Sequence, residues 1–331
     1  MTRINEIWNE LENDKYLTNS LLLRRYSANT LPDVYVAFQR PEFIRCIAFR
    51  IQKTNNFNVS RYITLKDIKI SLVPDDNDYT RSFLLIALSN KEHIEVFSTL
   101  AEDLINQIAS TTEDNKLIKE VLNRFEKWNA LFNKATLDGL SPEEQRGLYG
   151  ELYFLRKWIA GSSNLGECIQ SWLGPEKELR DFQSGGWALE VKTTHGNNHQ
   201  KIHISSERQL DTTNLNTLIL YHISLESQQQ HGETLNEIVN SLLEQLSIDV
   251  SAQIQFKSKL LLGGYFFHHT PKYENRGYQI RHESYYDVRE GFPRISESDI
   301  PRGVGDVKYS IIITEHPDYI VTESFVLEII K

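Results

Sequence analysis

A short segment in the middle of the 331-residue chain, Arg180 to Lys192, predicts a tight β-hairpin and constrains the fold more than any other feature. Gly185-Gly186 favours a two-residue turn, because glycine takes a positive φ without a Cβ clash. The register that follows from this turn sets Asp181 opposite Glu190. Two carboxylates are therefore expected side by side in a strand pair.

The second strand of this hairpin alternates between apolar and polar side chains. Its period of two sends Trp187, Leu189 and Val191 to one face and Ala188, Glu190 and Lys192 to the other. With the apolar set packed inward, Asp181, Glu190 and Lys192 should share one surface. Neighbouring like charges in a strand pair are destabilising unless something compensates them. A divalent cation is the obvious candidate, because Mg²⁺ takes oxygen ligands from one or two carboxylates, water and substrate phosphate.

These residue types at this spacing suit phosphodiester hydrolysis. Lys192 could hold or deprotonate the attacking water, while a metal ion stabilises the charge that develops on the phosphate. The acid-x-Lys triplet by itself is a weak signal, since Asp67-Ile68-Lys69 and Asp306-Val307-Lys308 repeat it and are both expected on strands. The paired acid across a tight turn sets the third copy apart.

The helix that precedes the hairpin begins with a strong signal. Ser141-Pro142-Glu143-Glu144 supplies an N-cap serine, a proline at the first helical position and a glutamate that completes a capping box. On the expected helix, Pro142 to Ala160, the core stripe consists of Leu148, Leu152, Leu155 and Ile159. Glu151 lies at the edge of this stripe, beside Gly147 and Gly150, which each cost the helix about 1 kcal/mol relative to alanine. A nearby metal site would account for both the acid and the glycines.

A plainer interpretation of the same residues stays open at this point. Glu151 would be a solvated residue on the flank of its helix. Asp181 and Glu190 would be ordinary hairpin acids, with Arg180 and Lys192 as their partners. Each residue alone favours this interpretation, whereas the combination favours the metal site.

Three segments resemble the PD-(D/E)xK nuclease superfamily: Gly147 to Leu152 (GLYGEL), Arg180 to Phe182 (RDF) and Ala188 to Thr194 (ALEVKTT). More narrowly, they resemble a bacterial family of that superfamily that is found near restriction-modification and phage-defence genes. The match covers about Ser141 to Tyr221. It departs from the pattern in one place, where Arg180 replaces the proline before the first acid, and this puts only the name of the motif in doubt.

The resemblance implies roles for five residues: Asp181 and Glu190 as metal ligands, the backbone carbonyl of Val191 as a further ligand, Glu151 as an acid that reaches the metal through water, and Lys192 as the catalytic lysine. The implied cofactor is Mg²⁺, with Mn²⁺ as a substitute. The implied partner is DNA.

Polar residues after the hairpin are candidates for contact with the substrate. In related nucleases, side chains at the positions of His203, Ser205 and Gln209 approach the scissile phosphate or the DNA backbone. As structural residues they would instead cap the next helix. His195, His199 and His203 repeat every four residues, which could suggest zinc, but a strand-and-turn context breaks the helical geometry that such a site needs. We interpret these histidines as surface or substrate-facing residues.

The remaining pattern predicts an α/β fold: a mixed-sheet, restriction-endonuclease-like core flanked by helices and preceded by a strand-rich N-terminal domain. We place the domains at 1–135 and 136–331. The first should be an antiparallel meander of strands at Asp33–Phe38, Phe43–Gln52, Ile63–Val73 and Arg81–Ser89, followed by bridging helices at His93–Ile108 and Lys116–Phe132. The second should continue with strands at Lys201–Ser205 and Thr217–Ser224, a short helix near Glu207, helices at Glu233–Leu246 and Ile254–Leu262, and a Tyr/Arg-rich β tail from Tyr265 to Ile330.

The net charge of −9 argues against a protein that coats nucleic acid non-specifically, because such binding rests on many Lys and Arg contacts to phosphate. A nuclease needs only a local positive surface. In the tail, basic residues set among tyrosines could neutralise phosphates and stack on bases: Lys272, Arg276, Arg281, Arg289 and Arg294. A sheet with one solvated face predicts much the same composition.

Neither the cysteines nor the apolar runs suggest a secreted or membrane protein. Cys46 and Cys168 are too far apart for a metal-ligand spacing and are expected to be buried, reduced thiols. The longest apolar runs fall far short of the roughly 20 residues that cross a bilayer. We expect a protein of the cytoplasm.

Three functions from different classes are compatible with these features. The first is a Mg²⁺-dependent endonuclease acting on DNA in restriction or phage defence, where the biological role comes from the resemblance alone. The second is a catalytically silent DNA-binding module with a nuclease fold. The third is a scaffold subunit whose N-terminal domain docks other proteins of a defence complex. Two copies could also pair as a homodimer to cut both strands.

Overall fold

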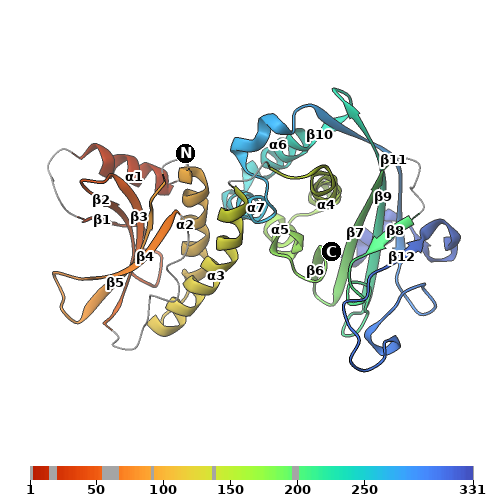
Figure 1. Cartoon of the computed structure of the whole chain (residues 1–331), viewed down its shortest axis with the longest axis horizontal. Helices are drawn as coiled ribbons and strands as arrows, with labels where there is room; N and C mark the ends of the chain where they lie inside the picture. The colour runs from red at the N-terminus through yellow and green to blue at the C-terminus, as the bar shows by residue number, and fades with distance from the viewer. Residues whose placement is uncertain are drawn as a thin grey trace. The chain divides into compact units, whose positions relative to one another are not determined.

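The structure, a computed structural model, describes residues 3–14, 21–53, 67–90, 93–135, 139–195 and 201–330. The chain divides into two units, Met1–Leu137 and Asp138–Lys331, each of which contains helices and a sheet (Figure 1). The first unit is rich in strands, and the second has a mixed sheet with flanking helices, so the predicted α/β class is confirmed. In the described ranges no helix combines the length and the apolar character that crossing a bilayer requires.

The first unit is built on a five-stranded antiparallel sheet in the order β1-β2-β3-β5-β4. Its strands are β1 (Leu21–Arg25), β2 (Val34–Gln39), β3 (Ile44–Gln52), β4 (Ile68–Pro74) and β5 (Arg81–Leu88). The predicted meander is wrong at one step, because β5 lies between β3 and β4. β5 is buried along nearly its whole length and needs neighbours on both sides, whereas β4 carries several exposed or half-buried residues and suits an edge. β1 was not predicted, and residues 63–66 of the expected strand Ile63–Val73 lie outside the described residues.

Three helices complete the first unit: α1 (Arg3–Asn13), α2 (Ile94–Ile108) and α3 (Asp114–Ala135). Trp8 of α1 is fully buried, and its indole Nε1 lies 3.0 Å from Ala37 O and 3.0 Å from Cys46 O. These two residues are paired across β2 and β3. The indole therefore joins α1 to both strands at one point.

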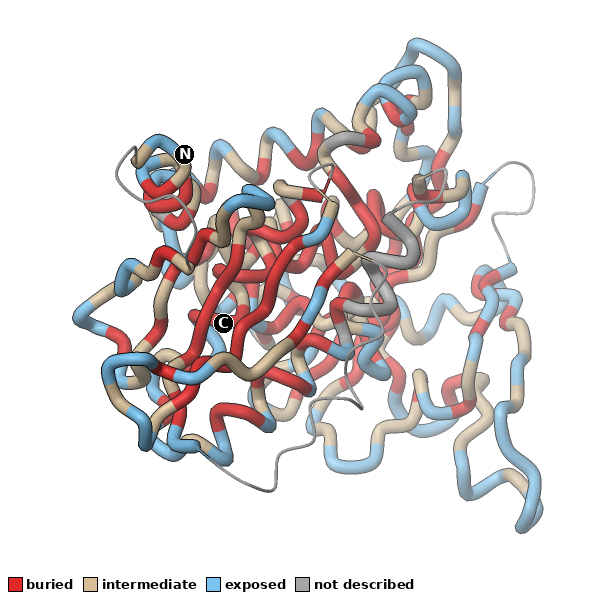
Figure 2. Tube along the Cα trace, turned by 60° about the vertical axis from the view of Figure 1, so that its left-hand side comes forward, coloured by how far each residue is buried: buried red, intermediate tan, exposed pale blue. Residues whose placement is uncertain are grey.

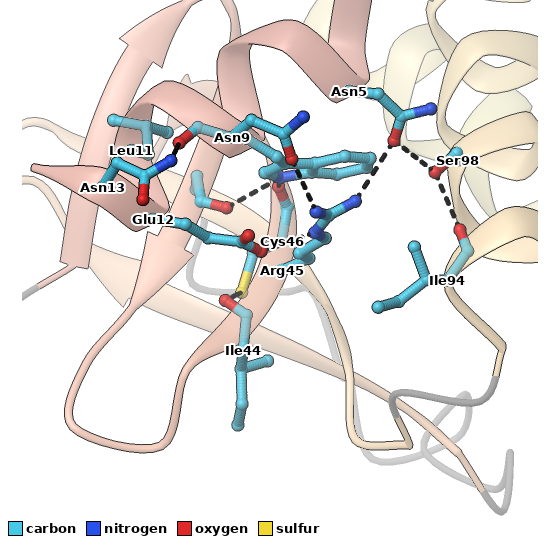
Figure 3. A network of polar contacts seen from close by, with 12 residues as sticks. Asn5, Asn9, Leu11, Glu12, Asn13, Ile44, Arg45, Cys46, Ile94 and Ser98 are labelled. Atoms are coloured by element: carbon cyan, nitrogen blue, oxygen red, sulfur yellow. Dashed lines mark hydrogen bonds and ion pairs between the residues drawn. The ribbon is translucent and has the colours of Figure 1, made fainter. Parts of the chain in front are cut away.

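A polar network surrounds this tryptophan (Figure 3). Arg45 of β3 lies over the Trp8 ring and donates from Nε to Glu12 Oε1 at 2.7 Å. Arg45 also donates to Asn5, and Asn5 accepts a hydrogen bond from Ser98 of α2. One arginine thus ties β3 to α1, which is tied in turn to α2.

The second unit contains a six-stranded mixed sheet with the order β10-β11-β9-β7-β6, in which β13 also pairs with β11. Its strands are β6 (Phe182–Ser184), β7 (Trp187–His195), β9 (Thr217–Gln229), β10 (Glu233–Thr234), β11 (Arg276–Asp287) and β13 (Ile320–Val321). β7 and β9 run parallel, and the other pairs are antiparallel. Two further strands, β8 (Lys201–Ile204) and β12 (Tyr309–Ile312), form a separate antiparallel ribbon.

The helices of this unit are α4 (Pro142–Gly161), α5 (Leu165–Ser171), α6 (Leu235–Gln245), α7 (Val250–Leu262) and α8 (Glu323–Ile329). Short 3-10 turns occur at Gly174–Glu176, Leu246–Ile248, Phe267–Lys272, Glu297–Asp299, Ile313–Glu315 and Pro317–Tyr319. The capping box predicted at Ser141 is confirmed, with Glu144 N donating to Ser141 Oγ and Glu144 Oε2 accepting from Ser141 N.

Both faces of β7 are covered, so the surface that Glu190 was predicted to share with Asp181 and Lys192 is not open to solvent at Glu190. On one face Leu189 packs in a core with Leu152 of α4. On the other face Ala188 packs with the apolar side chains of the β8–β12 ribbon. Figure 2 colours the chain by burial and shows long buried stretches, with exposed residues gathered mainly at the periphery. The period of two predicts which residues of β7 share a face, but the side chains that cover these faces come from segments distant in the sequence.

The end of the chain differs most from the prediction. The tail contains one long strand, β11, two short ones, several 3-10 turns and the closing helix α8. Its core tyrosines, all buried, are Tyr265, Tyr273, Tyr278, Tyr285 and Tyr286. The helix expected near Glu207 is a turn. Asp306 has a φ of +55° and lies before β12, so Asp306-Val307-Lys308 is not on a strand, and Asp67 likewise precedes β4.

The cysteines behave as predicted, since Cys46 and Cys168 are both buried and free.

The glycines of α4 have a different explanation from the nearby metal site that the sequence suggested. A Cβ on Gly150 would lie 2.4 Å from Thr193 Cγ2, so this glycine permits close packing of α4 on β7. Around Gly147 no described atom lies within 4 Å of such a Cβ, and the structure does not explain this residue.

We expect Gly150→Ala to destabilise the second unit by about 1–3 kcal/mol, because Thr193 is β-branched and stiff and must be displaced. The matched change on the same helix, Gly147→Ala, should instead stabilise it by up to about 1 kcal/mol through helix propensity. Urea unfolding of both variants measures the difference. Equal effects would contradict the close-packing explanation, and adding Thr193→Ala to Gly150→Ala should recover part of the loss.

Candidate active site

The Gly-Gly turn has the geometry that the sequence predicts. Gly185 and Gly186 have φ values of +51° and +91°, and β6 pairs with β7 in the expected register. Asp181 directly precedes β6, and the continued register places it opposite Glu190. Asp181 Oδ2 accepts a hydrogen bond from Val191 N at 2.7 Å, which orients the carboxylate at the end of the strand pair.

Helix α4 brings a third acid to the same place. A Cβ built on Gly174 would lie 2.4 Å from Glu151 Oε2 and 3.0 Å from Asp181 Oδ1. The two carboxylates therefore meet around this glycine, where any larger residue would push them aside. Trp172 Nε1 donates to Glu151 Oε2 at 2.7 Å and gives this acid a fixed partner.

The loop that carries Trp172 is held by a buried lysine of α7. Lys259 Nζ donates to Gln170 O at 3.0 Å and to Trp172 O, and it forms an ion pair with Glu176 Oε1 at 3.2 Å. The two carbonyls belong to the C-terminal end of α5, where a positive charge is favoured. Lys259 therefore keeps Trp172 in the position from which it reaches Glu151.

Glu190 is 1% exposed and is held from two sides. Lys192 Nζ forms an ion pair with Glu190 Oε1 at 2.7 Å, and Gln209 Nε2 donates to the same oxygen at 2.7 Å. Gln209 Oε1 accepts from Lys192 Nζ at 3.2 Å and from Ser205 N at 2.9 Å. Within the described ranges the second oxygen, Glu190 Oε2, is buried and has no hydrogen-bond partner.

The close approach of these acids shifts their titration. Burial raises the pKa of Glu151 to about 7, although the hydrogen bond from Trp172 opposes the shift. The pKa of Asp181 is raised well above its usual value, first by burial and then by the charges of Glu190 and Glu151. Burial alone would lower the pKa of Lys192, but the carboxylates around it outweigh burial and raise it. Lys192 therefore carries a positive charge near neutral pH.

The donor set suits a hard divalent cation. Mg²⁺ is usually bound by one or two carboxylates together with water and substrate phosphate. Among the described residues, no group of three or more His, Cys, Asp or Glu side chains is arranged to hold a metal ion by itself. Asp181 and Glu190 supply carboxylate oxygens, and the unpartnered Glu190 Oε2 is an atom that needs a ligand. The residues present fit such an ion.

The predicted substrate-contact residues separate into two groups. Gln209 lies in the site, where it contacts both Glu190 and Lys192. His203 and Ser205 are exposed on and just after β8, and His203 Nδ1 lies 2.7 Å from Ser310 Oγ of β12. Of the spaced histidines, His195 is exposed at the end of β7. His199 lies outside the described residues.

Sequence reasoning missed Trp172, Gly174 and Lys259. The Gly174-Pro175 pair marks a turn before the hairpin, but no spacing in the chain shows that an indole meets an acid 21 residues away. The contact of Lys259 with Gln170 spans 89 residues. Such pairs follow from packing between α4, α5 and α7.

The plainer interpretation of the acids holds only in part. Lys192 does pair with Glu190, but Arg180 donates to Asp211 O and to Gln183 Oε1 instead of Asp181. In the tail, three of the arginines also bind groups of their own chain: Arg281 to Glu226, Arg289 to Asp318 O and Arg294 to Leu210 O.

The pKa of Glu151 predicts how stability depends on pH without metal. Native Glu151 keeps its proton up to a pH of about 7, whereas the usual pKa of a glutamate is 4.5, so the native state binds more protons between these values. The free energy of unfolding should therefore fall as pH rises from about 5 to about 7 and level off above that range. Glu151→Gln should flatten this slope and raise stability at about pH 8 by about 1–3 kcal/mol. Urea unfolding in EDTA at several pH values measures both, and an unchanged slope would show that another group is responsible.

A family model described as "Putative PD-(D/E)XK family member, (DUF4420)" matches residues 4–314. Comparison with curated proteins and with solved structures gives no match. The family match includes α4, the hairpin and the β8–β12 ribbon, and it confirms the resemblance seen in the sequence. The chain therefore belongs to this family of the PD-(D/E)XK type, with a nuclease-like fold.

Proposed function

We propose that the protein is an endonuclease that hydrolyses phosphodiester bonds in DNA, with Mg²⁺ as its cofactor and Mn²⁺ as a substitute. The observation that carries the proposal is the meeting of Glu151, Asp181 and Glu190 beside the ammonium group of Lys192. Glu190 is buried and Glu151 and Asp181 are partly buried, so ionising all three acids beside Lys192 would leave negative charge that is costly away from bulk water. A divalent cation compensates this charge, whereas a purely structural core has no need of it.

In this proposal, four residues hold the metal ion in different ways. Asp181 and Glu190 would hold the metal directly, with the carbonyl of Val191 as a further ligand and Glu151 in contact through water. When bound, such an ion stabilises the charge that develops on the phosphate and lowers the pKa of a coordinated water. Trp172 Nε1 orients Glu151, and Val191 N orients Asp181. The acids are thereby placed before any substrate arrives.

Lys192 acts in this proposal as a fixed ammonium group. Its Nζ carries three donors, of which two are directed to Glu190 Oε1 and Gln209 Oε1. The third can hold the attacking water or a phosphate oxygen. Without metal, the carboxylates around Lys192 raise its pKa and keep it protonated, which suits a role in orienting water and stabilising charge.

The substrate and the biological setting are further parts of the proposal. DNA as the substrate and restriction or phage defence as the setting are supported by the resemblance, and two copies would pair if both strands are cut. The alternative is a catalytically silent DNA-binding or scaffold subunit of a defence complex. Retention of all three acids and the lysine supports the active form.

Plasmid and single-stranded DNA incubated with the purified protein and Mg²⁺ or Mn²⁺ should be cleaved. Asp181→Ala and Lys192→Ala should each lower the rate by at least about a hundredfold, because each removes charge stabilisation at the phosphate. Asp67→Ala and Lys69→Ala are matched controls, since they change the same acid-x-Lys pattern in the first unit and should leave the rate unchanged. Gel assays of nicked and linear product measure the rates.

Cleavage by Asp181→Ala or Lys192→Ala at the wild-type rate would refute the site assignment. A wild-type protein that binds DNA but cleaves it with neither ion would favour the silent alternative.

Metal binding can be measured apart from cleavage. Mg²⁺ should raise the Tm of the wild-type protein, by an amount that grows with its concentration above Kd, because it binds only the folded state. The effect should be larger at about pH 8 than at about pH 6, since protons compete for the same carboxylates. Asp181→Asn should raise the Tm without metal at about pH 8, by removing a carboxyl whose ionisation the native state disfavours, and should abolish the response to Mg²⁺. An equal response in this variant would place the ion elsewhere.

A further inference from the structure

The β8–β12 ribbon has one face in the core and one face in solvent (Figure 1). The buried side chains are those of Ile202, Ile204 and Ile311. Lys201 and His203 alternate with them and are exposed. Across the ribbon, Lys201 lies opposite Ile312, and His203 lies opposite Ser310, to which it is hydrogen-bonded. The outer face therefore consists of short polar and basic side chains beside one exposed isoleucine.

The charge of this face differs from that of the whole chain. The chain carries −9, yet neither strand of the ribbon contains an acid. The continued register sets Ser205 opposite the exposed Lys308, so a lysine lies at each end of the face. Among the described residues, neither Lys201 nor Lys308 forms an ion pair. The nearest acid along the loop is the exposed Asp306.

The ribbon is also tied directly to the candidate site. Ser205 N donates to Gln209 Oε1 at 2.9 Å, and Gln209 Nε2 donates to Glu190 Oε1 at 2.7 Å. The buried Glu207 accepts from Val307 N at 2.9 Å, which fastens the end of β8 to the segment before β12. Phosphates of one DNA strand follow each other at about 3.4 Å along the axis. Because Gln209 bridges Ser205 N and Glu190 Oε1, the Ser205 end of this face is within the reach of neighbouring phosphates of a strand bound in the site.

We propose that the outer face of the ribbon, defined by Lys201, His203, Ser205, Lys308 and Ser310, binds the phosphate backbone of duplex DNA beside the site. The inference rests on the proposed nuclease function. Lysines neutralise phosphates, and hydroxyl and imidazole groups donate to phosphate oxygens, so these contacts position the duplex without reading its sequence. A two-stranded ribbon is also narrow enough for the major groove of B-DNA.

Binding without cleavage tests this surface. In EDTA, the anisotropy of a labelled duplex of about two helical turns gives the affinity at several salt concentrations. The double variant Lys201→Ala/Lys308→Ala should bind about tenfold more weakly, and the slope of log K against log salt should shrink by about 2. The loss should be the same for a scrambled duplex, because the contacts are to the backbone. Both side chains are exposed, so the Tm should match that of the wild type.

Two control variants separate a local surface from a general effect of charge. Lys69→Ala/Lys119→Ala removes the same charge from exposed positions of the first unit and should keep the wild-type affinity and slope. Asp306→Asn removes an acid next to Lys308 and should strengthen binding.

Three results would overturn the inference: equal losses in both double variants, an unchanged salt slope in Lys201→Ala/Lys308→Ala, or no binding of duplex by the wild-type protein. A wild type that binds duplex through these lysines but never cleaves it would support the surface and refute the nuclease proposal. If the wild-type protein cleaves DNA and Lys201→Ala/Lys308→Ala binds duplex as tightly as the wild type does, the nuclease proposal is supported and the binding surface is refuted.

Discussion

Repulsion between buried carboxylates is the constraint around which the second unit is organised. The hairpin sets Asp181 beside Glu190, and α4 adds Glu151, so three acids meet at a place that is only partly open to solvent. Burial and mutual repulsion raise the pKa of Asp181, which shows that the fold holds these groups against their own preference. Such an arrangement persists only where the packing of the surrounding structure prevents the carboxylates from moving apart. The packing of α4 on β7 provides that support.

Each acid has its own fixed donor, and the donors come from different parts of the fold. Trp172 donates to Glu151, and the Val191 amide donates to Asp181. Gln209 and Lys192 both bind Glu190. These supports orient the carboxylates before a ligand is present, which is how preorganised sites are built. The turn that carries Gln209 also begins at the end of β8. The site and the solvent-facing ribbon are therefore parts of one connected structure.

The first unit follows a different principle, because the polar groups around Trp8 and Arg45 find their hydrogen-bond partners within the unit. Trp8 donates to two strand carbonyls, and Arg45 binds side chains of α1. Its acid-x-Lys triplet shows how little that pattern means alone. Lys69 is exposed on an edge strand, and Asp67 lies 3.7 Å from His93. The same three-residue spacing acquires chemistry only where a second strand and a helix bring other acids to it.

What the sequence determined by itself are the features that depend on near neighbours along the chain. These are the Gly-Gly turn with its register, the capping box at Ser141 and the helical stripe that leaves Glu151 at its edge. Tertiary structure alone decided the rest: the insertion of β5 between β3 and β4, the cover over Glu190, the use of tail tyrosines in the core, and the contact of Trp172 with Glu151. The physical reason is one of range. Turns, caps and alternation are set by steric and hydrogen-bonding rules within a few residues, whereas burial and charge pairing depend on which distant segments pack together.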